Sequence, residues 1–260
     1  MIKKLLIVLF VALIFTGCTQ KNNPVEPTDN NTDNNSTVTP SKPDETPTTP
    51  ETNKEIGMNV TISTIQREAS DGKENEGKET VDLKQAKISF NRLPETVDEL
   101  KSIDRTGEDG KFITMALLIC SFKTWNPDDE TVCEEMMKEL LNSPTVDNNY
   151  TAYTKSFVKE RMLQNDKWGY IADAYFDGAE SSYGYEPDLP LTITLREYPY
   201  LPQTSTMYGT ELSIDKVVIE FEGADSERSI SVYQDPTDNK WYVWSDSYKG
   251  LLTDIRFPAK

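Results

Sequence analysis

The sequence predicts an α+β domain in which N-terminal helices pack on one face of a C-terminal antiparallel meander. Between residues 93 and 164 the apolar side chains recur at helical spacing, whereas after Pro190 they alternate with polar ones, as in half-buried strands. Turn-forming residues at 223–226 and 236–239 separate the later runs. A sheet of this kind needs one face covered, and the helices can cover it.

The helical part is expected to begin with a short helix and a long buried one. Leu93 to Thr96 opens the first helix, which breaks at the glycines between residues 107 and 110. Residues Phe112 to Phe122 are almost continuously apolar and are not dominated by β-branched side chains. Such a run favours a helix that is buried on most sides over a strand.

Two further helices are expected before the strands. Asn126 can cap a helix that continues through Pro127 and the acids after it, because proline suits the first turn and acids suit the positive end of the dipole. This helix should end before Pro144. A fourth helix is expected from about Tyr153 to Gln164.

The predicted strands are runs in which every second residue is apolar. Met58 to Thr64 forms the first, and the charged, glycine-rich stretch Arg67 to Glu79 after it is interpreted as a loop. The meander is expected to consist of Leu191–Leu195, Val217–Phe221, Ile230–Val232 and Trp241–Val243.

Residues 1–18 have the features of a targeting segment. Lys3 and Lys4 form a positive region, and Leu5 to Phe15 form an apolar stretch that is too short to span a bilayer. Thr16-Gly17-Cys18 follows and resembles the lipobox of bacterial lipoproteins. The resemblance implies a signal peptide and a lipidated Cys18 that anchors the protein on the extracytoplasmic side of the cell membrane. An ordinary secretory signal is the alternative.

Residues 19–55 differ in composition from the rest of the chain. They are rich in Asn, Thr, Pro, Asp and Glu, and apart from proline only Val25 and Val38 are apolar. Such a stretch cannot bury enough apolar surface to offset its ordering entropy. It is expected to be a disordered linker between the anchor and a single α+β domain at residues 56–260.

Charge and composition exclude several classes of function. The formal net charge is −17, and phosphates repel an acidic surface, so nucleic acid is not expected as a partner. The chain contains no histidine, which removes Ser-His-Asp and Cys-His catalytic systems and histidine-ligated metal sites. No cofactor or metal site is expected, and the balance favours a protein that is not an enzyme.

Cys120 and Cys133 are the cysteines that follow Cys18. If the two central helices form a hairpin that turns near Asn126, the two thiols lie at one level and a disulfide is geometrically possible. Both cysteines fall on apolar faces, where small buried thiols are common. Buried thiols are favoured, and a disulfide is the alternative.

The segment from Trp168 to Glu186 is where a ligand is expected to bind. It contains six aromatic and four acidic residues and has neither helical nor strand period. Aromatic rings on a loop give contact area at little entropic cost. In the competing interpretation, most of the rings fold inward over the junction of helices and sheet. The candidate ligand-binding residues are Trp168, Tyr175, Asp177, Tyr183, Tyr185 and Glu186.

An ordered series of short motifs runs through the folded part. The motifs are Leu93-Pro94 with Glu99-Leu100, Tyr175–Ala179 continuing to Tyr185–Pro187, Gly223–Arg228, and Trp241–Trp244 with Asp254–Pro258. In this order they resemble an uncharacterised family of bacterial proteins, mainly from Firmicutes, known only as a domain of unknown function. The resemblance covers about Ile88 to Pro258 and implies no activity and no functional residues.

These observations favour a surface-anchored lipoprotein whose non-catalytic domain binds a glycan or protein of the cell envelope. The alternative is a glycan-processing hydrolase that uses paired carboxylates in the 168–186 loop, since two suitably spaced acids suffice for glycoside hydrolysis. A concave cleft with two facing carboxylates above an aromatic floor would favour the hydrolase, and a filled surface would favour the binding domain.

Overall fold

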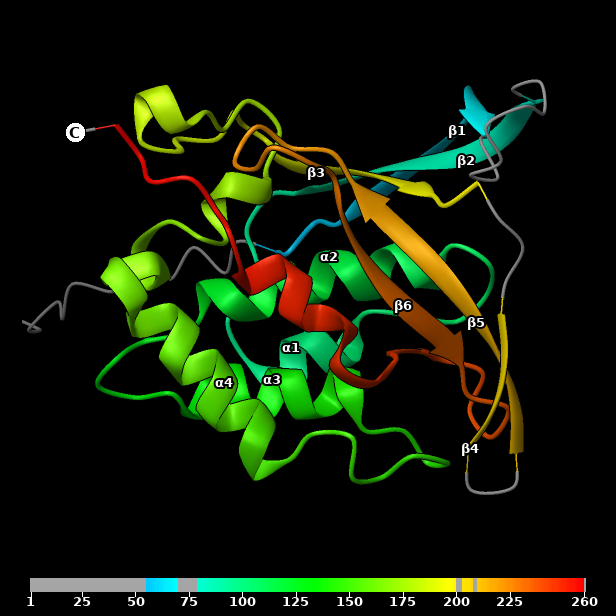
Figure 1. Ribbon diagram of the computed structural model, residues 1–260. Coiled ribbons are helices and arrows are strands. Elements are labelled where there is room, and N and C mark those ends of the chain that lie inside the picture. Colours follow the sequence, from blue (N-terminus) through cyan, green and yellow to red (C-terminus); the bar gives the residue numbers. More distant parts are fainter. Residues whose placement is uncertain (1–54, 70–78, 200–202, 208–209, 260) are drawn as a thin grey trace, which may run out of the picture. The chain divides into compact units, whose positions relative to one another are not determined.

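In the computed structural model, helices pack on one face of an antiparallel sheet (Figure 1). The structure describes residues 55–69, 79–199, 203–207 and 210–259, and all of them belong to one compact unit. The predicted α+β fold is confirmed, with the helices preceding most of the sheet in the chain. The predicted signal peptide, Cys18 and residues 19–54 of the predicted linker lie outside the described residues.

The described strands are β1 (Asn59–Ala69), β2 (Glu79–Phe90), β3 (Leu191–Glu197), β4 (Gln203–Met207), β5 (Thr210–Ile219), β6 (Arg228–Gln234) and β7 (Trp241–Val243). The described α-helices are α1 (Val97–Ser102), α2 (Gly110–Lys123), α3 (Thr131–Leu141) and α4 (Ala152–Leu163). Short 3-10 segments are η1 (Gln164–Gly169), η2 (Asp173–Tyr175), η3 (Ser181–Tyr183) and η4 (Ser245–Leu252).

Within the described residues the sheet has seven strands, in the order β1-β2-β3-β5-β6-β7, and β4 pairs with β5. Neighbouring strands are antiparallel, and Leu195 of β3 lies opposite both Ala86 of β2 and Ile219 of β5. Along the chain, the β1–β2 hairpin comes before the helices, and the remaining strands follow them. In the sheet, β2 of this hairpin pairs with β3, so the hairpin extends the predicted C-terminal meander.

The predicted loop from Arg67 to Glu79 is wrong at both ends. β1 extends to Ala69 and β2 begins at Glu79, so only residues 70–78 separate them, and these lie outside the described residues. The end of β1 was missed because Gln66, Arg67 and Glu68 are polar and exposed, so the apolar alternation that predicted Met58–Thr64 does not continue through them. Its strand conformation is set by backbone pairing with β2 from Asn59 to Ala69.

The long apolar run forms α2, and every residue from Gly110 to Phe122 is buried, as predicted. The helix packs directly on the sheet, and α3 packs against α2 (Figure 1). Gly110 begins the helix at a close approach, because a Cβ atom there would lie 2.1 Å from the carbonyl oxygen of Arg105. A larger residue would push the α1–α2 connection away from the helix.

The start of the next helix was predicted too early. The Asn126 side chain accepts a hydrogen bond from the Asp128 amide at 2.8 Å, and Asp129 accepts one from the Thr131 amide at 3.0 Å. These bonds form two successive turns, and α3 begins only at Thr131. Asn and Asp side chains favour such local turns as well as helix caps, which explains the shift.

Cys120 of α2 and Cys133 of α3 are both free and buried, which confirms the interpretation as thiols. Burial disfavours the thiolate and raises the pKa of both thiols far above the ordinary value. The two cysteines therefore act as small core side chains.

The other face of the sheet carries a smaller apolar cluster, made of Val146, Leu212, Ile214, Tyr233 and Tyr242. The connection between α3 and α4 reaches this cluster through Val146. It is fixed by the buried Asp235 carboxylate, which accepts hydrogen bonds from Ser143 Oγ at 2.5 Å and from the Thr145 amide at 2.9 Å.

Candidate functional site

Two of the predicted ligand-binding rings belong to the core. The Tyr175 ring is buried, and its hydroxyl donates a hydrogen bond to the Leu251 carbonyl at 2.6 Å. Tyr185 is also buried, stacks on Tyr170 with the ring centroids 5.7 Å apart, and donates to the Arg256 carbonyl at 3.0 Å. Burial raises the pKa of Tyr185 to about 12. These rings support the segment and offer no face to a ligand.

The other predicted rings lie at the surface. Trp168 of η1 is 38% exposed and Tyr183 of η3 is 74% exposed. Glu186 is exposed as well. The 168–186 segment thus combines buried rings that hold it on the domain with exposed rings that a ligand could reach.

Phe257 is an exposed ring that the sequence did not single out, at 58% exposure. It lies in a C-terminal segment attached to the predicted loop on both sides, through the Tyr185–Arg256 bond and a hydrogen bond from the Ala259 amide to the Ser181 carbonyl at 2.6 Å. The Asp254–Pro258 motif was a signal that this segment matters, but nothing in the sequence placed it beside η3.

The loop acids closest to the sheet and to α2 are held by partners outside the loop. Asp173 forms an ion pair with Lys123 of α2 at 2.5 Å. The Asp177 carboxylate accepts a hydrogen bond from the Thr194 hydroxyl of β3 at 2.8 Å, and its backbone amide donates to the Thr192 carbonyl. Asp177, a predicted ligand-binding residue, therefore attaches the loop to β3.

A pocket of about 490 Å³ lies between the β2–α1 connection, the end of α2, the start of α3 and the start of β3. The described residues that line it include one carboxylate, Glu95, and no aromatic ring. It is therefore unlike the cleft expected of a glycoside hydrolase. The lining residues are Asn91, Arg92, Leu93, Pro94, Glu95, Lys123, Thr124, Val132 and Leu191.

The rim of this pocket is fixed by a paired Arg92 and Glu99. The guanidinium donates to both carboxylate oxygens, at 3.0 and 2.5 Å. The Glu99 carboxylate also accepts from the Glu95 amide at 2.8 Å, and the Thr96 hydroxyl accepts from the Glu99 amide at 3.2 Å. The hydrogen bonds from Arg92 and from the Glu95 amide lower the pKa of Glu99 to about 2. They also fix the start of α1, which the sequence predicted.

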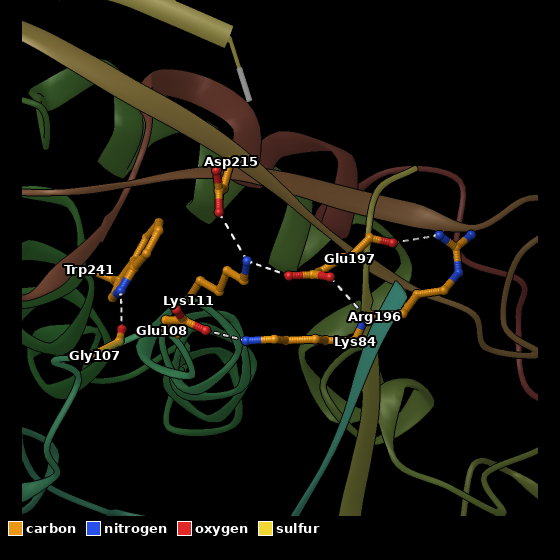
Figure 2. A network of polar contacts seen from close by, with 8 residues as sticks. All are labelled: Lys84, Gly107, Glu108, Lys111, Arg196, Glu197, Asp215 and Trp241. Atoms are coloured by element: carbon orange, nitrogen blue, oxygen red, sulfur yellow. Dashed lines mark hydrogen bonds and ion pairs between the residues drawn. The ribbon is translucent and has the colours of Figure 1, made fainter. Parts of the chain in front are cut away.

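A polar network connects α2 to the sheet, with Lys111 between two carboxylates (Figure 2). The Lys111 ammonium contacts Glu197 of β3 at 2.7 Å and Asp215 of β5 at 3.0 Å. The Lys84 amide donates to the other Glu197 oxygen at 2.8 Å, and the Lys84 side chain pairs with Glu108. The network therefore ties one end of α2 to three strands.

The two carboxylates keep Lys111 protonated, which disfavours a role for it as a nucleophile or base. Burial acts to lower the pKa of Lys111, but the hydrogen bonds to Glu197 and Asp215 outweigh it and raise the pKa above its ordinary value. A protonated ammonium has no free electron pair for attack on a substrate. The geometry is that of a structural ion-pair network.

The described residues provide no further sign of a reactive centre. Among them, no group of three acidic or thiol side chains is arranged to hold a metal ion. Within the same residues, none of the helices combines the length and apolar character needed to cross a bilayer.

These features define a class of protein. It is an α+β domain with a buried apolar core, one pocket described above, and exposed aromatic rings on the 168–186 segment, which hydrogen bonds attach to the rest of the domain. Residues 92–259 match the model of a family described as "Domain of unknown function (DUF6935)", and the chain belongs to this family. The matched range agrees closely with the one expected from the motifs. No curated protein and no solved structure matches the chain.

Proposed function

We propose that the protein is a lipid-anchored surface protein whose domain binds a glycan or protein of the cell envelope without catalysing a reaction. The binding surface is the set of exposed rings Trp168, Tyr183 and Phe257, together with the exposed Glu186. The membrane is reached through a lipidated Cys18.

The exposed rings carry this proposal. Hydrogen bonds and the Tyr170–Tyr185 stack hold the 181–185 turn, and the Arg256–Ala259 segment is bonded to the same turn. Aromatic rings held on a rigid base lose little entropy on binding and give a large contact area. Single exposed apolar residues are ordinary, but three exposed aromatic rings on connected segments favour a docking surface.

The anchor is supported by the sequence alone. Lys3 and Lys4, the apolar stretch after them and Thr16-Gly17-Cys18 fit the signal of a lipoprotein. A diacylated cysteine carries two chains, which hold a protein on a membrane far longer than one.

The hydrolase alternative has less support. Asp173 and Asp177 are held by Lys123 and Thr194, and the described pocket contains a single carboxylate, Glu95. A glycosidase needs two carboxylates on opposite sides of the bond to be cleaved.

Binding is tested with purified protein and an array of envelope glycans and proteins. The double variant Trp168→Ala/Tyr183→Ala should lose at least tenfold in affinity for any ligand found, with an unchanged unfolding midpoint. Tyr153→Ala, which removes an exposed ring at the start of α4, is the matched control and should bind normally. Equal binding by all three proteins would contradict the assigned surface.

Anchoring is tested by metabolic labelling with a fatty acid in the source cell. Cys18→Ala should abolish the label and release the protein from the membrane fraction. Labelling that is undiminished in Cys18→Ala would refute the anchor.

A further inference from the structure

Lys167 is a buried lysine without a carboxylate partner in the described part of the chain. Its side chain lies in η1, the residue is only 5% exposed, and its ammonium donates one long hydrogen bond, to Gln164 Oε1 at 3.4 Å. Asp254 attracts the ammonium electrostatically, but no ion pair joins Lys167 to an acid among the described residues. Buried lysines are normally paired, because desolvating a charge is costly.

The other buried cations among the described residues all have such a partner. Arg105 contacts Glu139 at 2.8 Å, and Lys111 contacts Glu197 at 2.7 Å. Arg196 contacts Glu220 at 3.1 Å and also pairs with Glu227. In a chain with a net charge of −17, carboxylates are plentiful, so the absence of one beside Lys167 is specific to this position.

The guanidinium of Arg161, in the last turn of α4, lies close to the Lys167 ammonium. Its Nη1 donates to Gln164 Oε1 at 3.4 Å, so both cationic groups contact one oxygen atom. Its Nη2 reaches Glu160 only at 3.9 Å, and its Nε is buried without an acceptor among the described residues. The guanidinium lies over the Phe157 ring at 5.1 Å, which fixes its plane. The neighbouring Lys167 and Arg161 side chains therefore have N–H donors that no described acceptor uses fully.

We propose that Lys167 and Arg161 bind a phosphate group of the ligand, beside the exposed ring of Trp168. A phosphate has enough acceptor oxygens to take hydrogen bonds from an ammonium and a guanidinium together, and such charged bonds are the strong ones. The ligand is then a phosphate-bearing molecule whose sugar or other flat face can rest on the neighbouring ring. The assignment of this ligand rests on the proposed binding function, whereas the anion site is testable by itself.

Thermal unfolding of the protein in inorganic phosphate, with ionic strength held constant by sodium chloride, tests the site. Ligand at about ten times its Kd should raise the Tm of the wild type by about 3–6 °C. Lys167→Met should abolish this rise, and its Tm without phosphate should equal or exceed that of the wild type, since an uncompensated buried charge has been removed. Lys101→Met, an exposed lysine on α1, makes the same charge change and should keep the full rise.

The proposal fails if phosphate does not raise the wild-type Tm, or if Lys167→Met responds as strongly as the wild type. A structural lysine would instead give a lower Tm without phosphate and an unchanged response. Should Lys167→Met not fold, Arg161→Gln replaces a partly exposed side chain and should lower phosphate affinity at least tenfold in calorimetric titration; unaltered affinity would overturn the site.

Two probes identify the source of the phosphate. Glucose 1-phosphate should bind more tightly than inorganic phosphate if a sugar rests on Trp168, and Trp168→Ala should remove only that gain. Binding to phosphatidylglycerol vesicles that depends on Lys167 would keep the site and replace the sugar by a lipid headgroup. A Lys167-dependent phosphate response together with a negative envelope screen would refute the proposed function and leave the anion site standing.

Discussion

Replacing Lys111 with methionine is expected to destabilise the domain strongly. Methionine has nearly the same volume, so the change removes the charge and leaves almost no cavity. Glu197 and Asp215, which both contact the ammonium within 3.0 Å, would then face each other without a cation. Breaking a buried ion pair from one side costs about 3–5 kcal/mol. Because both acids keep some solvent access and Glu197 keeps the Lys84 amide, we expect a loss of about 3 kcal/mol.

Urea unfolding at pH 7, followed by tryptophan fluorescence, measures this loss. Lys84→Met is the matched control, because it breaks the neighbouring but exposed Lys84–Glu108 pair and should lower the free energy of unfolding by less than about 1 kcal/mol. Combining Lys111→Met with Glu197→Gln and Asp215→Asn should recover most of the loss. A loss for Lys111→Met no larger than the loss for Lys84→Met would show that the Lys111 ion pairs do not stabilise the domain in this way.

The same network has a defined pH dependence. Because the folded-state pKa of Lys111 is raised, its stabilising effect is complete at neutral pH and below. It should disappear only as the pH rises beyond the ordinary lysine pKa of about 10.4. The difference in stability between wild type and Lys111→Met should therefore be constant from pH 6 to pH 9 and should shrink above that range; a difference that shrinks at neutral pH would contradict the raised pKa.

Tyr185→Ala should lower the free energy of unfolding by about 3–5 kcal/mol because its ring is buried. Tyr183→Ala should change it by less than about 0.5 kcal/mol, and comparable losses in urea unfolding would contradict the assigned burial. Cys120 and Cys133 should react with a thiol reagent without reductant only after denaturation, so labelling of the folded protein would contradict their burial. Since the folded pKa of Glu99 is lowered to about 2, its stabilisation is present above the ordinary value of about 4.3 and is lost toward pH 2. Glu99→Gln should therefore be less stable than wild type in thermal unfolding at pH 7 and equally stable near pH 2. A difference in Tm that persists at pH 2 would contradict the lowered pKa of Glu99.

The elements that the sequence predicted are those with a local signal. The apolar run from Phe112 to Phe122 can be satisfied only by burial on nearly all sides, and α2 is buried in this way. The helix opening at Leu93–Thr96 and the alternation in β3, β6 and β7 are equally local, and both are present. Each depends on residues within a few positions of one another. The run at Val217–Phe221 was only partly right, because β5 extends from Thr210 to Ile219.

β2 lacked such a signal. Leu83 faces one side of the sheet, whereas Ala86, Ile88 and Phe90 face the other, so the apolar residues change phase in the middle of the strand. The strand is defined by its hydrogen bonds to β1 and β3, and β3 is about a hundred positions further along the chain. A single sequence does not contain that pairing as a pattern.

The candidate site shows the same limit. The amino-acid sequence was enough to predict the class of fold, the buried helix, the aromatic and acidic character of the 168–186 segment and the absence of histidine chemistry. The burial of Tyr185 and the exposure of Tyr183 depend on the folded chain, because the same side chain stands at both positions. The fold also gives Lys111 acidic partners 86 and 104 residues away, whereas Lys167 has no acidic partner among the described residues. Hydrophobic period is a property of neighbouring residues, whereas the burial of one ring and the pairing of one charge depend on groups that only the folded chain brings together.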